Sequence, residues 1–323
     1  MPAEPLLTVT IDRFVSVPGK GLVRLVGAAG SEPPPPVSAE LQPIYLALRH
    51  GDLARARSLI DALEPARNEI NHITALRVFA QMLSGELTAA HDLALTLDES
   101  AFAHNTVRSA YAAVLLVAGE NDEAARLLEE VLQEDSRHEI ARYVYALWRA
   151  QCGELQSAHD LLVSLCRDYP DHALARLQLG QVLMAAGDVA RAGTLFEAAI
   201  DGAPMLAQGW ERFAALLVVG GQPQEALQVA KRGLSWHPGS RPLLEILARS
   251  ALAVGAFDIA VDATRLVLVT CDDDPVAYAN YAVALTAANR RETALTTLRE
   301  AIARFPDDEP LQQLRGEIEG VSR

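Results

Sequence analysis

The chain has 323 residues, of which half are hydrophobic and 22% are charged, and its formal net charge is −14. This acidic balance argues against binding to a phosphate backbone, which requires concentrated Lys and Arg, so we expect no nucleic-acid partner. Three cysteines do not form the pattern of a disulfide framework, and no segment approaches the roughly 20 apolar residues of a membrane helix. We therefore expect a cytoplasmic protein that does not insert into a membrane. The first residues lack the features of a secretory signal, although a chain from which a signal had been removed would read the same.

The N-terminal segment differs from everything that follows it. Residues 6–27 are rich in β-branched side chains and contain the turn-forming sequence PGKG at residues 18–21, a pattern that predicts a β-hairpin. Because two strands alone are marginally stable in water, such a hairpin would have to dock on the first helices, pair with another chain or stay partly disordered. The proline run at residues 33–36 favours an extended spacer, so residues 1–36 are expected to form an N-terminal extension.

From residue 37 onward the sequence repeats every 34 residues without an insertion. One position of the period is alanine in every copy: Ala56, Ala90, Ala124, Ala158, Ala192, Ala226, Ala260 and Ala294. A period of this length predicts a small unit that is copied and stacked, because one copy cannot bury its apolar face alone. The chain is therefore expected to be an all-α solenoid with eight units between residues 37 and 308.

A tight turn is expected in the middle of each unit. The fifteenth position of the successive units holds Gly51, Gly85, Gly119, Gly153, Gly187, Gly221, Gly255 and Asn289. Glycine accepts positive φ at little cost and asparagine is the next most tolerant residue, so a helix ends there. The following position is often acidic, as at Asp52 and Asp188, which favours the N-terminus of a second helix. Each unit is thus predicted to be a helical hairpin.

The remaining positions identify the kind of hairpin. A small residue stands at the eighth position in six units, after a large apolar residue in each of these, and a proline near the end, such as Pro204, stops the second helix. This pattern resembles the tetratricopeptide repeat family, most clearly at Leu179, Gly180, Leu183, Gly187, Ala192, Phe196, Ala199 and Pro204. The first two units depart from it, with Pro43 and Arg77 at the seventh position. The resemblance implies a right-handed superhelical solenoid.

The C-terminal segment, residues 309–323, is expected to be a capping helix. Leu311, Leu314 and Ile318 fall on one helical face among polar residues. Such a helix would cover the open end of the last unit.

No pattern in the chain favours catalysis. The Gly-Lys-Gly sequence lacks the spacing of a phosphate-binding loop. Cys152, Cys166, His159 and His172 share one unit, but their irregular spacing disfavours a zinc site. No serine lies in a nucleophile elbow, and no carboxylate pair stands out from the solvated helix faces. We therefore expect no catalytic residue, no metal site and no cofactor, and the chain is not expected to be an enzyme.

The resemblance also implies which side chains line the inner face, because the first helix of each repeat faces the groove of the superhelix. The candidate partner-binding residues at these positions are Leu41, Tyr45, Phe79, Met82, Leu116, Tyr143, Leu147, Leu177, Gln181 and Met184. The later units add polar candidates: Glu211, Glu245, Arg249 and Asn280. Related domains hold the C-terminal carboxylate of chaperone peptides with Lys and Asn at fixed inner positions, and because those positions are not basic here, such capture is disfavoured. The pattern favours a groove that holds an apolar or amphipathic segment, a peptide or a helix, of another protein.

Three alternatives remain open at this point. Tighter winding of the repeats, or the N-terminal segment, could bury the inner-face side chains, since soluble proteins seldom expose large apolar patches. The predicted hairpin could instead attach the chain to a larger multi-protein assembly, with the solenoid as a spacer. An enzyme would require an active site built from residues to which we assign no catalytic role, such as Glu211 or Arg249.

Overall fold

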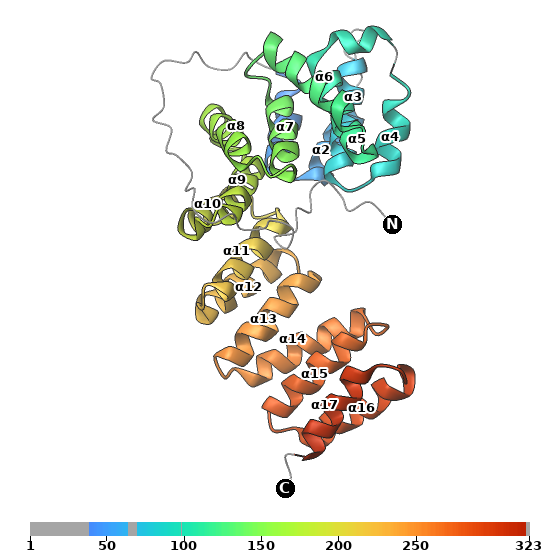
Figure 1. Cartoon of the computed structure of the whole chain (residues 1–323), viewed down its shortest axis with the longest axis vertical. Coiled ribbons are helices and arrows are strands. Elements are labelled where there is room, and N and C mark those ends of the chain that lie inside the picture. The colour runs from blue at the N-terminus through green and yellow to red at the C-terminus, as the bar shows by residue number, and fades with distance from the viewer. Residues whose placement is uncertain (1–38, 64–69, 98, 321–323) are drawn as a thin grey trace. The chain divides into compact units, whose positions relative to one another are not determined.

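A computed structural model describes residues 39–63, 70–97 and 99–320. They divide into two compact units, the first up to Leu206 and the second from Ala207 onward. All regular secondary structure in these ranges is helical, without a strand (Figure 1). The all-α prediction is therefore confirmed for this part of the chain, whereas the β-hairpin expected at residues 6–27 lies outside the described residues.

The first unit is built from five helical hairpins. Its helices are α1 (Gln42–Arg49), α2 (Leu53–Ala62), α3 (Ile70–Leu83), α4 (Leu87–Ala94), the 3-10 helix η2 (Glu99–Ala103), α5 (Asn105–Ala118), α6 (Asn121–Glu134), α7 (Glu139–Gln151), α8 (Leu155–Asp168), α9 (Ala173–Ala185) and α10 (Val189–Gly202). Each first helix packs against its own second helix, and from α3 to α9 also against the first helix of the next hairpin. These contacts bury the apolar stripe of each hairpin.

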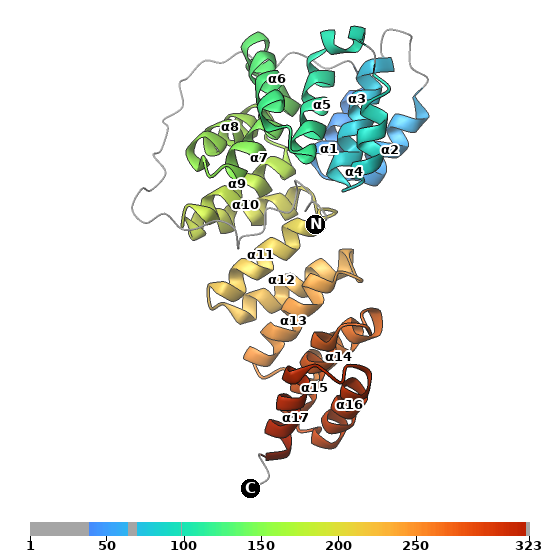
Figure 2. The ribbon, with the colours of Figure 1, turned by 45° about the vertical axis from the view of Figure 1, so that its right-hand side comes forward.

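The second unit contains three hairpins and a final helix. Its helices are α11 (Ala207–Val219), α12 (Pro223–Trp236), α13 (Arg241–Ala253), α14 (Phe257–Thr270), α15 (Pro275–Ala287), α16 (Arg291–Arg304) and α17 (Glu309–Gly320). Helix α17 packs on α15 and α16 (Figure 2), and its Leu311 and Ile318 are buried. This helix lies where the sequence predicts a capping helix.

The turn in the middle of each unit is confirmed. All seven glycines at the fifteenth position have φ between 66° and 87°, and Asn289 in the eighth unit has φ of 59°. Among the described residues Asn289 is the one non-glycine with positive φ. The side chains of Asp52 and Asp188 then cap the second helix by accepting a hydrogen bond from the backbone three residues later.

The periodic alanine marks the closest approach of the two helices in a hairpin. All eight alanines at this position are completely buried. A small residue on the facing helix serves the same purpose: a Cβ atom added to Gly180 of α9 would collide with the ring of Phe196 on α10. The repeated small residues therefore allow the two helices of a hairpin to lie close together.

The two irregular units keep the fold by local adjustments. Pro43 lies in the first turn of α1, where its missing N–H costs no helical hydrogen bond, and α1 begins only at Gln42. Arg77 stands where other units have a large apolar residue, and its guanidinium pairs with Asp61 at 2.8 Å.

Among the described helices, none combines the length and the apolarity that a bilayer-spanning segment requires.

Candidate functional site

The inner-face residues of the first unit come together, but they are buried. At most 7% of the surface of each of these residues is exposed: Leu41, Tyr45, Phe79, Met82, Leu116, Tyr143, Leu147, Leu177 and Gln181. Met184 is partly exposed. The ring of Phe79 meets that of Tyr143 edge to face, with centroids 6.3 Å apart. These side chains form an interior instead of an open surface.

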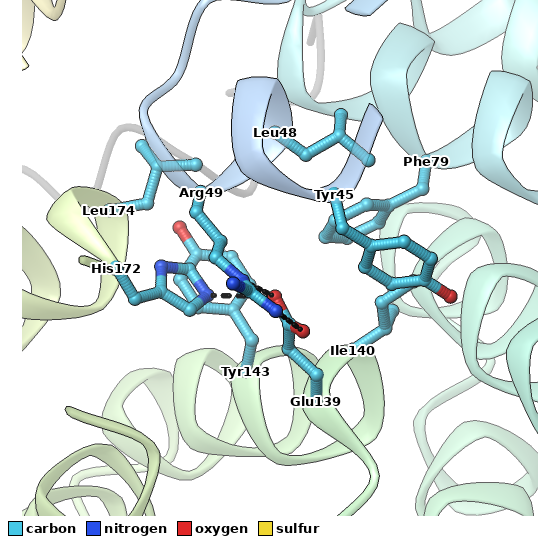
Figure 3. Close-up of a pocket in the computed structure, with 9 residues that line it drawn as sticks. All are labelled: Tyr45, Leu48, Arg49, Phe79, Glu139, Ile140, Tyr143, His172 and Leu174. Carbon is cyan, nitrogen blue, oxygen red and sulfur yellow. Dashed lines mark hydrogen bonds and ion pairs between the residues drawn. The ribbon is translucent and has the colours of Figure 1, made fainter. Parts of the chain in front are cut away.

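The interior is closed because α1 packs back against α9. At the end of α1, Arg49 donates from Nε and Nη2 to the two carboxylate oxygens of Glu139 on α7, at 2.8 and 2.9 Å (Figure 3). Its Nη1 lies 3.3 Å from Asp171, and its guanidinium carbon lies 4.2 Å from the ring centroid of Tyr169. We call the Arg49–Glu139 ion pair the clamp. It joins the first hairpin to the fourth across 90 residues of chain.

Backbone packing closes the unit at a second point. A Cβ atom added to Gly51 would lie 2.8 Å from Leu206 and 3.4 Å from Leu174. The turn of the first hairpin therefore touches the side chains of the fifth repeat directly, and only glycine fits there.

The electrostatics of the clamp follow from its burial. Burial raises the pKa of the Glu139 carboxyl, and the hydrogen bonds from Arg49 work against that rise. Beside it, burial and the charge of Arg49 lower the pKa of His172 to about 3. The neutral His172 ring accepts a hydrogen bond from the backbone N–H of Ala175 at Nδ1, 3.2 Å away, and so caps α9. The ring also stacks on Tyr143.

Little free space remains inside the first unit. A cavity of about 10 Å³ is lined by Tyr45, Leu48, Arg49, Phe79, Glu139, Ile140, Tyr143, His172 and Leu174 (Figure 3). A second cavity of about 20 Å³ is lined by Phe79, Met82, Leu83, Ala113, Leu116, Tyr143, Val144 and Leu147. Each has room for about one water molecule. The open apolar channel expected along Leu41 to Met184 is therefore wrong for this structure, because the first unit winds tightly enough to fill it.

One open hollow lies at the edge of the first unit, between α3, α4 and α5. It measures about 260 Å³ and is lined by Met82, Leu87, Thr88, His91, Val114, Val117 and Ala118. Of the candidate residues named from sequence, Met82 lines this hollow. The other six lining residues were not predicted as a site. The sequence does carry a signal for the hollow, because Val114 stands where the next unit has the much larger Trp148.

The inner-face candidates of the second unit are at least partly exposed. Glu211 and Glu245 are partly exposed, and Arg249 and Asn280 are exposed. The hydroxyl of Ser240 donates to Glu211 at 2.8 Å. Glu245 pairs with Arg241 at 2.7 Å; Arg241 and Arg249 each lie four residues from it along the helix.

Exposed apolar residues lie among these polar ones. On the first helices of the second unit, Val219 is 82% exposed, Val276 is 56% exposed and Val283 is 40% exposed. Val283 stands at the repeat position of Tyr45, Phe79 and Leu147. Val219 and Val276 stand at the thirteenth and second positions of their repeats, which the family resemblance also places on the inner face. Applying the inner-face pattern to the last three units would have found them from sequence.

The described residues contain no obvious metal site. Within residues 39–63, 70–97 and 99–320, no three His, Cys, Asp or Glu side chains are placed to hold an ion together. Cys152 is exposed, whereas Cys166 and Cys271 are partly buried.

Comparison with known proteins agrees with the hairpin geometry. A family profile described as tetratricopeptide repeat matches residues 149–207, from the end of α7 to the start of α11. Residues 149–207 are thus tetratricopeptide repeats, and the other hairpins of the chain share their 34-residue period. No curated protein matches it significantly.

Several solved structures share the fold of this chain. YrrB, a protein with an unusual peptide-binding site, matches at 20% identity and a TM-score of 0.52 over 59% of this chain and 99% of YrrB. The structure of the Cut9–Hcn1 complex matches at 16% identity and a TM-score of 0.62, over 85% of this chain and 54% of the matched chain. This chain therefore spans about half the length of that matched chain. The type IV pilus biogenesis factor PilW matches at 18% identity and a TM-score of 0.54, over 68% of this chain and 99% of PilW. At these identities the likeness shows the fold alone.

Proposed function

We propose that this chain is a non-enzymatic scaffold that holds a segment of another protein on the inner face of its second unit. Repeat arrays of this kind use concave surfaces for binding. The observation that carries the proposal is the contrast between the units. Inner-face residues are buried by the chain itself in the first unit, whereas Val219, Val276 and Val283 of the second unit remain exposed.

The chemistry of this surface suits a polypeptide. The other inner positions of α11, α13 and α15 include alanines, which let a partner backbone or helix approach closely: Ala215, Ala253, Ala279 and Ala287. Exposed valines offer apolar contact, and the exposed Arg249 and Asn280 offer hydrogen-bond donors at the same face. An apolar centre with a polar rim is the usual anatomy of a protein interface.

Two of the similar structures support the class of function. The YrrB structure is described as having a peptide-binding site, and Cut9 is described in a complex with Hcn1. These statements concern those proteins. For this chain they favour binding of a polypeptide over catalysis.

Site-specific photo-crosslinking tests the proposal. A photoreactive phenylalanine analogue is placed at position 219 or 276 in the full chain, expressed in its own cells and irradiated. We expect a crosslinked partner from both positions, identified by mass spectrometry. Val269 is the matched control because it is 75% exposed but lies on α14, the second helix of its hairpin.

Two crosslinking results would contradict the proposed binding face. Crosslinks of the same yield and partner from position 269, or none from positions 219 and 276, would refute binding at this face. The variants Val219→Asp and Val276→Asp should also weaken co-purification of the crosslinked partner, while Val269→Asp should not. Since all three side chains are exposed, these changes should leave the fold intact.

A further inference from the structure

The hollow between α3, α4 and α5 is separate from the surface proposed above. It belongs to the first unit and remains open although the interior behind it is closed. Its volume of about 260 Å³ exceeds that of the engineered cavity of about 150 Å³ in another protein that binds benzene. The hollow is therefore large enough to receive an aromatic or long aliphatic side chain.

The lining of the hollow is mainly apolar and adaptable. Val114, Val117 and Leu87 provide aliphatic contacts, while Thr88 and His91 are exposed polar residues of the lining. Met82 lines the hollow and also the cavity of about 20 Å³ in the interior. Because methionine is flexible and polarizable, Met82 can adjust to the shape of an inserted group.

The chain around the hollow is acidic. Residues 81–96 and 114–125, which contain the whole lining, hold five carboxylates and neither Lys nor Arg. Two of them are neutralised from outside, Glu86 by Arg57 and Glu123 by Arg126. The carboxylate of Asp92 lies 3.6 Å from Nδ1 of His91. Within the described part of the chain, the carboxylates of Asp92, Glu120 and Asp122 pair with no Lys or Arg. An apolar hollow in such surroundings favours a cationic partner.

We propose that this hollow binds a short basic segment of a partner polypeptide, which inserts one aromatic or long aliphatic side chain flanked by Lys or Arg. The anchor fills the space above Met82, and the flanking cations lie near Asp92, Glu120 and Asp122. Burial of such an anchor contributes about tenfold to a hundredfold in affinity. The exposed charges add an attraction that weakens as salt is raised.

Methyl NMR of the full chain provides a direct test. The probe is the synthetic peptide acetyl-GKKGWGKKG-amide, titrated into protein labelled with 13C at the methionine methyl groups. We expect a saturable shift of the Met82 methyl signal, with Met184 and Met205 as internal references. A peptide with alanine in place of tryptophan should bind at least tenfold more weakly, and one with glutamate in place of lysine should not bind measurably.

Two variants fill the hollow from different helices. Ala118→Phe acts from the end of α5 and Thr88→Trp from α4, and both positions are exposed. Each should abolish the Met82 response to the peptide while circular dichroism shows a wild-type melting curve. Ala186→Phe, at the same position of the fifth repeat, is the matched control and should bind as the wild type does.

The proposal is overturned by any of three results. These are an unmoved Met82 signal at millimolar peptide, equal affinity for the alanine peptide, or undiminished binding to both filled variants when they are folded. None of these readouts depends on the second unit, so failure of this proposal would leave the proposed binding surface on α11, α13 and α15 untouched, and the reverse also holds.

Discussion

Removing the charge of Arg49 would show whether the clamp holds the first unit closed. Arg49→Met keeps most of the aliphatic stem but leaves Glu139 without its cation in a site where 9% of that side chain is exposed. Breaking one partner of a buried pair costs about 3 to 5 kcal/mol. Because 15% of the Arg49 side chain is exposed to solvent, we expect the lower end, about 3 kcal/mol.

The cost should fall mainly on α1. This helix is the part of the first unit that the clamp joins to α7, so its local opening becomes easier by the same free energy. Hydrogen exchange followed by mass spectrometry should show a loss of protection of about a hundredfold in the peptide covering Gln42–Arg49, since about 1.4 kcal/mol corresponds to tenfold. Protection of α13, in the second unit, should not change.

A double variant separates the charge from the packing. In Arg49→Met with Glu139→Met, no buried charge is left alone, so stability should return to within about 1 kcal/mol of the wild type. The single variant's loss of stability relative to the wild type should also shrink as pH falls. Its Glu139 has a folded pKa above the unfolded one, so the folded state takes up the proton first. Unchanged exchange of α1 in the single variant, or a double variant as unstable as the single, would refute the reasoning.

Two further predictions concern the interior of the first unit. Gly180→Ala should destabilise the protein by about 2 kcal/mol, because its Cβ would meet the ring of Phe196 and the gain in helix propensity is smaller; Gly316→Ala in α17, where a Cβ would meet nothing within 4 Å, should be neutral or stabilising in the same urea titration. Burial lowers the pKa of His138 to about 4 and that of His172 to about 3, so both cap a helix as neutral rings and the unfolded chain binds more protons below its own pKa of about 6.5. Stability should therefore fall as pH drops from about 6.5 towards those values. His172→Asn, which keeps a capping side chain, should flatten this slope in urea titrations at pH 7, 5 and 4; an unchanged slope would show that His172 does not cause it.

The features that the sequence predicts well are those set within one repeat. The positive φ at Gly51 and at Asn289, and the complete burial of Ala56, follow from rules that involve a single turn or a single helix pair. Such rules act identically in every copy, so eight copies repeat the same signal. This is why the hairpins and their turns could be read from spacing alone.

The closure of the first unit is a property of the whole array and could not be read in this way. Small rotations between neighbouring repeats add up, and only their sum decides whether α1 reaches α9. Arg49 and Glu139 lie 90 residues apart, and each looks in the sequence like an ordinary charge on a solvated helix. One signal was present: Arg49 occupies an inner-face position among apolar residues.

The closure of the first unit also explains where accessible binding surfaces remain. In an open repeat array, stability is nearly a sum of contacts between neighbours, and the inner lining stays exposed. The clamp and the contact of Gly51 with Leu206 add links between the first and the later hairpins of the first unit. Its apolar lining consequently serves as a core, and the hollow beside Met82 offers accessible apolar space at the edge of the unit.

The second unit differs from the first in the side chains at its inner positions. Several of its inner positions carry short or β-branched side chains, such as Ala215 and Val283, beside the charged Arg249. Large aromatic residues at the corresponding positions of the first unit, such as Tyr45 and Phe79, fill a closed interior. We therefore expect side-chain size at the inner positions to contribute to whether a stretch of repeats forms a core or a binding face. Enlarging the alanines of the second unit should reduce partner binding even though the substituted residues remain apolar.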